Sequence, residues 1–185
     1  MLNERPWLAG GTGILLAGGV LAFTAAAGGG GAVGLDLALR AAHVLAAIVW
    51  GGLIVFVNFV QLEALRIAAH EDRAAIVREI VPRTGRAFTA AAHATLVTGL
   101  VLLVPVGSSV FSRPVLLAAV VGGSAMWAIV QFVLRPGIAR ITGATAASDE
   151  DKARARVSIA FWARVNLVLV TPVTVLMLVA AHGGL

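Results

Sequence analysis

The stretch HVLAAIVWGGLIVFVNFVQ, residues 43–61, decides the fold. It contains no Asp, Glu, Lys or Arg, yet it carries a histidine, a tryptophan, an asparagine and a glutamine. A helix rises about 1.5 Å per residue, so about twenty apolar residues span the ~30 Å hydrocarbon core of a bilayer. Backbone polar groups inside lipid must be satisfied within the segment, and the stretch is therefore expected to be a transmembrane helix.

The polar side chains of this stretch share one stripe of the expected helix. At about 100° per residue, Trp50 lies roughly 20° from His43 around the axis, and Gln61 returns to the same angle. Asn58 lies roughly 60° away. Because polar side chains are costly where they meet lipid, we expect this stripe to face the interior of a helix bundle.

The rest of the chain has the same membrane character. Of its 185 residues, 59% are hydrophobic and only 12% are charged, whereas soluble domains have about twice that charged fraction. We therefore expect one all-α transmembrane domain over residues 1–185, a polytopic five-helix bundle. The expected transmembrane helices are 7–27, 38–62, 87–106, 115–134 and 162–183, with a cytoplasmic amphipathic segment at about 63–81 that Pro82 ends.

The basic residues predict an orientation. Of the 14 Lys and Arg residues, all but two fall in connections on one side of the expected helices. The positive-inside rule then places the N-terminus in the cytoplasm and the C-terminus outside, in a multi-pass protein of the bacterial inner membrane. The net charge of +5 is read as this topology signal, and nucleic acid is not expected as a partner.

Several classes of chemistry are disfavoured by composition. The chain has no cysteine, which excludes disulfides, thiolate metal sites and covalent c-type haem attachment. Every Asp and Glu lies in a connection or at a helix end, so a buried carboxylate relay of a proton-coupled transporter is not expected. Common hydrolase, P-loop and zinc-protease motifs are absent, and an enzymatic activity is left open.

The histidines suggest a redox site. His43 and His182 lie on antiparallel helices at the same, outer depth, whereas His93 belongs to the other half of the bilayer. A bis-histidine haem needs two neutral imidazoles at similar depth, so we expect His43 and His182 as ligands of haem iron, with His93 in reserve. The alternative is that each histidine only hydrogen-bonds a neighbouring helix, as we expect for His93 with Thr89.

Four segments carry a resemblance, taken in chain order. They are LRAAHVLAAIVWGGLIVFVNFVQ (39–61), IVPRTGRAFTAAAHATLVTGLVLL (80–103), AMWAIVQFVLRPGIARI (125–141) and ARVNLVLVTPVTVLMLVAAHG (163–183). Together they resemble integral membrane proteins similar to the N-terminal transmembrane domain of membrane-bound urate oxidase (urate hydroxylase). The chain departs from that family at Arg135, where the family's signature has tryptophan.

The resemblance implies a set of functional residues. It implies haem b held by His43 and His182, with Trp50, Asn58 and Asn166 lining the cofactor site. It also picks out Gln61, Arg83 and Pro172. The family's cytochrome c domain is expected to be absent, because the chain ends at Leu185 without a cysteine, and urate chemistry is then poorly supported.

Three functions remain open from the sequence. The first is a b-type haem electron-transfer subunit in the lipid bilayer, working with a cytochrome partner or a larger membrane complex. The second is a non-catalytic accessory or anchor subunit with no cofactor of its own. The third is a urate-oxidising enzyme that uses a separately encoded cytochrome.

Overall fold

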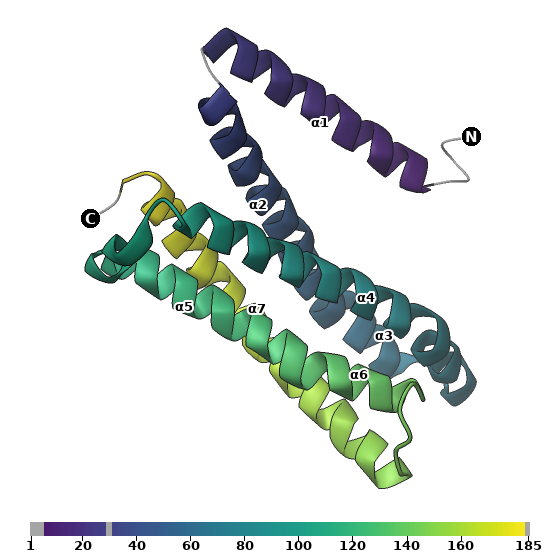
Figure 1. The fold of residues 1–185 in the computed structure, drawn as a ribbon. Coiled ribbons are helices and arrows are strands. Elements are labelled where there is room, and N and C mark those ends of the chain that lie inside the picture. Colours follow the sequence, from purple (N-terminus) through teal and green to yellow (C-terminus); the bar gives the residue numbers. More distant parts are fainter. Residues whose placement is uncertain (1–5, 29–30, 184–185) are drawn as a thin grey trace.

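The computed structural model describes residues 6–28 and 31–183. Over these residues the chain is a set of helices joined by short turns, with no strand, which confirms the all-α prediction (Figure 1). The elements are α1 (Pro6–Gly28), α2 (Gly31–Phe56), the π-helical η1 (Val57–Gln61), α3 (Leu62–Ile67), α4 (His70–Leu103), the 3-10 helix η2 (Gly107–Ser112), α5 (Pro114–Ile129), the π-helical η3 (Val130–Leu134), α6 (Arg135–Ile141) and α7 (Asp149–Ala181).

Four continuous helical rods in the described residues are long and apolar enough to cross a membrane. The rods are Gly34–Ile67, His70–Leu103, Pro114–Ile141 and Asp149–Ala181. They confirm a multi-pass membrane protein by length and composition. In the first helix, α1, the described apolar stretch Gly11–Thr24 is shorter than these rods.

The second rod, α4, differs from the sequence-based prediction. Residues 63–81 were expected to form an amphipathic segment ended by Pro82, but α4 runs without interruption from His70 through Pro82 to Leu103. The prediction that Pro82 ends a helix is wrong. Proline removes one backbone hydrogen bond, but Val81 and Phe88 on either side of it are buried, and their packing favours a continuous helix.

The helix α7 begins at Asp149, well before the expected transmembrane segment 162–183, and Ser148 is its N-cap. The Ser148 hydroxyl accepts a hydrogen bond from the backbone N–H of Asp151 at 3.1 Å, and the Ser148 N–H donates to the Asp151 carboxylate at 3.3 Å. This capping box satisfies two donors at the helix N-terminus. From there α7 continues as one helix to Ala181, with Pro172 inside it as expected.

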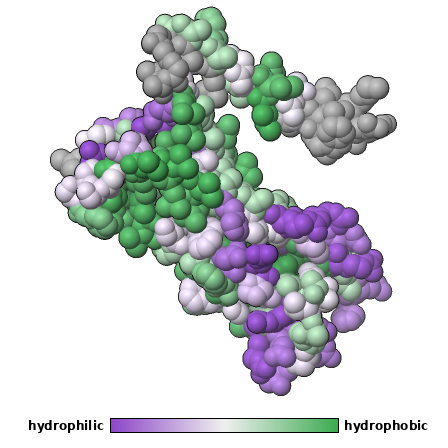
Figure 2. All heavy atoms as spheres, viewed as in Figure 1, coloured by the Kyte–Doolittle hydropathy of each residue, from purple (hydrophilic) through white to green (hydrophobic). Residues whose placement is uncertain are grey.

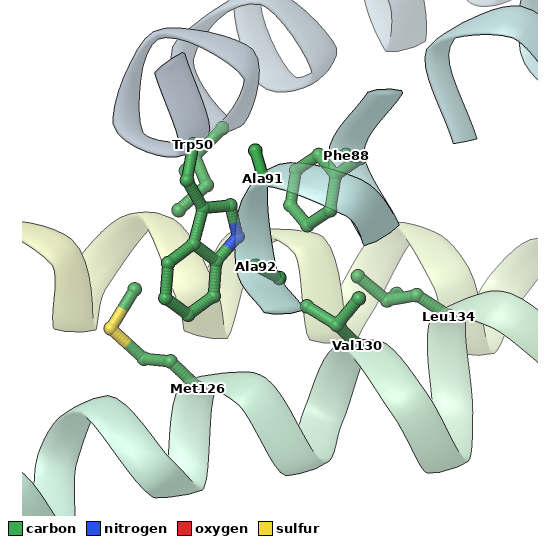
Figure 3. Close-up of a cluster of buried hydrophobic side chains, with 8 residues drawn as sticks. Trp50, Phe88, Ala91, Ala92, Met126, Val130 and Leu134 are labelled. Carbon is green, nitrogen blue, oxygen red and sulfur yellow. The ribbon is translucent and has the colours of Figure 1, made fainter. Parts of the chain in front are cut away.

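The rods pack as two helix pairs. The first pair is α2 with α4, the second is α5 and α6 with α7, and α1 makes its main contacts with α2 and stands apart in Figure 1. A core cluster joins the pairs, and in Figure 3 the Trp50 ring points from α2 toward Met126. Ala91 and Ala92 are buried beside it, and such small residues allow helices in lipid to approach closely.

The surface separates apolar and polar regions along the bundle. Large apolar side chains such as Ile48, Phe132 and Val168 are exposed on the rods, as expected where lipid covers a protein. Hydrophilic residues gather at the end that holds α3 and the beginnings of α4 and α7 (Figure 2). The exposed ion pair between Arg66 and Glu63 lies there, in α3. The bundle thus has an apolar middle and one strongly charged end.

Candidate functional site

The polar stripe of α2 and η1 faces the bundle interior, as predicted. Trp50 is 5% exposed and Gln61 8% exposed, while His43 and Asn58 are half-buried. The amide N–H₂ group of Asn58 donates to the carbonyl of Ile54 at 2.9 Å and to the carbonyl of Ala163 at 3.1 Å. Asn58 therefore ties the first rod to α7.

The centre of the bundle contains buried polar atoms that have no hydrogen-bond partner. Asn166, on α7, is 0% exposed, and neither atom of its amide group is paired. An unsatisfied buried polar group costs about 1–3 kcal/mol. The full set is Trp50 Nε1, Asn58 Oδ1, Gln61 Oε1, Trp127 Nε1, Gln131 Oε1, Asn166 Nδ2 and Asn166 Oδ1.

Two members of this set were not predicted as site residues. They are Trp127 and Gln131, which both lie on the third rod. Their spacing of four residues places them on one helix face, which is the signal that could have assigned them. The Trp127 ring also meets the edge of His93, with centroids 5.7 Å apart and ring planes at 82°.

Two π-helical segments interrupt the rods where polar residues are buried. The segment η1 contains Asn58 and Gln61, and η3 contains Gln131. A π-helical turn holds one more residue than an α-helical turn, is rare, and is found frequently at functional sites. No sequence pattern used here predicts such a turn, so both segments were missed.

A cavity of about 80 Å³ lies between η1 and η3. It is closed by the first half of α4, by α6 and by the beginning of α7. Its walls are mainly Ile, Leu, Val and Phe side chains. Its volume is enough for several water molecules, since one water needs ≳10–15 Å³ of such space. The polar residues of the lining are Asn58, Gln61, Thr84, Thr89, Arg135 and Arg156.

The histidines on the membrane rods share one hydrogen-bonding arrangement. The Nδ1 atom of His43 lies 3.0 Å from the carbonyl oxygen of Thr95 and 3.1 Å from the hydroxyl of Thr98. The Nδ1 atom of His182 lies 2.8 Å from the carbonyl oxygen of Leu178. A carbonyl only accepts, so Nδ1 carries the proton in each ring, and the Nε2 lone pair is left for a metal or a donor.

His93 has the same arrangement on α4. Its Nδ1 donates to the backbone carbonyl of Thr89 at 2.7 Å. The predicted pairing with Thr89 is confirmed, although the partner is the carbonyl and not the hydroxyl.

The predicted site residues fall into two groups. Trp50, Asn58 and Asn166 belong to the buried interior. His43 lies nearer the beginning of α2 and packs on α4, and His182 is exposed at the end of α7. No hydrogen bond, ring contact or metal-like cluster in the described residues joins the two imidazoles.

The bundle therefore has two chemically distinct ends. At the histidine end, α2 and α5 begin and α4 and α7 end, and it carries His43 and His182. At the arginine end, α4 and α7 begin and α3 and α6 lie, and it carries the cavity with Arg135 and Arg156. No family model matches this chain, and neither does any curated protein or solved structure.

Proposed function

We propose that the protein is a small electron-transfer subunit of the bacterial inner membrane that holds b-type haem at the histidine end. His43 and His182 would hold the haem iron through their Nε2 atoms. The observation that carries the proposal is that each imidazole pairs its Nδ1 with a backbone carbonyl, that of Thr95 for His43 and that of Leu178 for His182. Both Nε2 atoms are left free. Such outer partners orient metal-binding histidines and raise their basicity. The resemblance to the urate oxidase membrane domain supports the same pair.

The residues at this end fit haem in their chemistry. Two neutral imidazoles are a standard haem donor set. The flanking surfaces are apolar and exposed, with Val44 and Ile48 on α2 and Val175 on α7, as a porphyrin ring requires. When bound, the haem supplies one-electron chemistry, and a cytochrome or a larger membrane complex is the partner.

The chain's own residues set the position of the first ligand. The Thr95 carbonyl and the Thr98 hydroxyl hold the His43 ring from α4. Gly99 lies directly against that ring, since a Cβ placed at Gly99 would stand 3.0 Å from His43 Cε1. This close approach favours glycine at position 99.

The number of membrane crossings and their orientation are part of the proposal. The helix α1 is 23 residues long and reaches ~34 Å at 1.5 Å per residue, enough to cross the hydrocarbon core. With α1 as a fifth crossing, the basic residues favour a cytoplasmic N-terminus and an arginine end in the cytoplasm. The histidine end then lies at the outer leaflet.

The test is the reduced-minus-oxidised absorption spectrum of the full chain, expressed with ample haem precursor and purified in mild detergent. We expect a Soret and α-band change in the wild type, in His70→Ala and in His93→Ala. We expect its loss in His43→Ala. A wild type without bound haem contradicts the proposal, and so does a haem that depends on His93 and not on His43.

One observation favours a second function, that of an accessory subunit without a cofactor. Nothing lies within 4 Å of a Cβ placed at Gly11 or Gly18 of α1. These two glycines are seven residues apart and share one helix face, and glycine-rich faces in membranes favour close helix contacts. A partner helix would occupy this face. Affinity purification from native membranes should then recover a stoichiometric partner, and recovery of the chain alone contradicts this function.

A further inference from the structure

The cavity at the arginine end has a lining that selects ligands by charge. Arg135 and Arg156 line it, and neither forms an ion pair within the described part of the chain. By contrast, Arg66, Arg83 and Arg154 each pair with a carboxylate on their own helix. The cavity lining contains no Asp or Glu. Two guanidinium groups without a carboxylate favour an anion, and a planar carboxylate matches them best.

The buried part of the cavity favours a second group on the ligand, a hydrogen-bond donor. Gln61 Oε1 and Asn58 Oδ1 are buried acceptors without partners, and both residues line the cavity. Gln61 is more than nine-tenths buried. An acceptor in this position needs an N–H or O–H donor from whatever enters. The ligand therefore combines an anionic head with a donor group some distance from it.

The size and walls of the cavity limit the remainder of the ligand. The space between the polar groups is lined by Ile54, Phe88, Val130 and Ile159, which favour a short hydrocarbon link. An engineered cavity of ~150 Å³ accepts benzene, whereas this one measures about 80 Å³. An unbranched aliphatic chain fits this volume better than a ring.

We propose that this cavity is a binding site for a short-chain aliphatic hydroxy acid. Its carboxylate meets Arg135 and Arg156 at the mouth, and its hydroxyl donates to Gln61 Oε1 or Asn58 Oδ1 inside. The π-helical segment η1 presents both amides to the cavity, and η3 contributes the apolar side chains of Val130 and Leu134 to the lining. The site lies at the end of the bundle opposite His43 and His182, so it exists with or without haem.

The first test uses the wild-type full chain in neutral detergent and isothermal titration calorimetry with three matched probes. They are 4-hydroxybutyrate, butyrate (without the hydroxyl) and 1-butanol (without the charge). We expect 4-hydroxybutyrate to bind about tenfold or more tightly than butyrate, because an unpaired buried acceptor penalises butyrate, and 1-butanol to bind weakest. Equal affinities, or binding of none of the three probes, overturn the proposal.

Variants assign the two ends of the ligand. Arg135→Gln and Arg156→Gln should each weaken binding of both acids about tenfold or more, because a charge-assisted contact is lost. Gln61→Leu should reduce the preference for 4-hydroxybutyrate over butyrate. The control is Arg140→Gln, an exposed arginine on α6 outside the cavity lining, which should bind as the wild type does. An equal effect of Arg140→Gln contradicts the assignment. These expected affinities do not depend on haem, so they stay the same even if the absorption spectrum of the protein shows no haem.

Discussion

The two ends of the bundle differ in whether their polar side chains have hydrogen-bond partners. At the histidine end, His43 and His182 each have one ring nitrogen paired with a carbonyl, so each ring is held with its other nitrogen free. Toward the arginine end, the oxygens of Asn58, Gln61 and Gln131 are buried with no partner. The first arrangement holds two imidazoles in position to bind a metal. The second leaves buried acceptor oxygens that a small polar molecule with a hydrogen-bond donor can pair with. Four predictions test this contrast.

The largest effect is expected at His43. Replacement by alanine removes an axial ligand, and we expect haem to be lost completely from the purified protein. Haem content per protein chain, measured by the pyridine haemochrome assay, checks this. His70→Ala is the control, because His70 is exposed at the first residue of α4 and should leave the haem content unchanged. Full haem content in His43→Ala would contradict the role of His43 as a haem ligand, and with it the contrast between the two ends.

The next prediction compares two asparagines. Asn166 is fully buried and unpaired, so Asn166→Leu should raise the free energy of unfolding by about 1–3 kcal/mol. Asn58 has one unpaired oxygen but donates to two carbonyls, of which that of Ala163 lies on another helix. Asn58→Leu should therefore raise this free energy less than Asn166→Leu does, because about 0.6–1.7 kcal/mol is lost with the interhelical bond. Unfolding in mixed micelles with increasing denaturing detergent gives both values. A destabilised Asn166→Leu would show that this amide has a bound partner.

A smaller effect is expected from the glycine beneath the first ligand. In Gly99→Ala the new methyl group meets His43 Cε1 at 3.0 Å, so the ring must shift by a few tenths of an ångström. We expect about tenfold weaker haem binding, at the lower limit of the ~10–100-fold range for groups that orient metal ligands. Haem titration of the haem-depleted protein measures it. Gly52→Ala is the control, because a Cβ there meets open space, and it should bind haem as the wild type does. Equal losses of haem affinity in both variants would show that Gly99 does not position the His43 ring.

The smallest effect is expected at Thr98. Thr98→Val removes the hydroxyl 3.1 Å from His43 Nδ1 but leaves the Thr95 carbonyl as an acceptor. A neutral hydrogen bond contributes about 0.5–1.5 kcal/mol, and here the ring retains its second partner. Haem affinity should fall less than in Gly99→Ala, by the same titration. A larger loss than in Gly99→Ala would mean that the hydroxyl, and not the carbonyl, fixes the ring.

The sequence predicted features that depend on local patterns. Apolar runs predicted the membrane-crossing rods, because lipid leaves a helix as the only way to satisfy the backbone. Helical spacing predicted that Trp50 and Gln61 face inward, and both are buried.

Features that depend on packing between rods were not predicted. Pro82 usually ends a helix, yet buried neighbours keep α4 continuous. The segments η1 and η3 add a residue to a turn where two rods face one another, which no single stretch of sequence encodes. The cavity between them follows from these turns. The pairing of His43 with the Thr95 carbonyl joins residues 52 positions apart and required the fold.

The most direct test of the account is the electron paramagnetic resonance spectrum of the oxidised full chain, recorded beside that of His182→Ala. If Nε2 atoms of His43 and His182 bind one iron, the wild type gives a low-spin signal and His182→Ala converts it to a high-spin signal. A low-spin signal that survives in His182→Ala, or the absence of any haem signal in the wild type, would contradict the account.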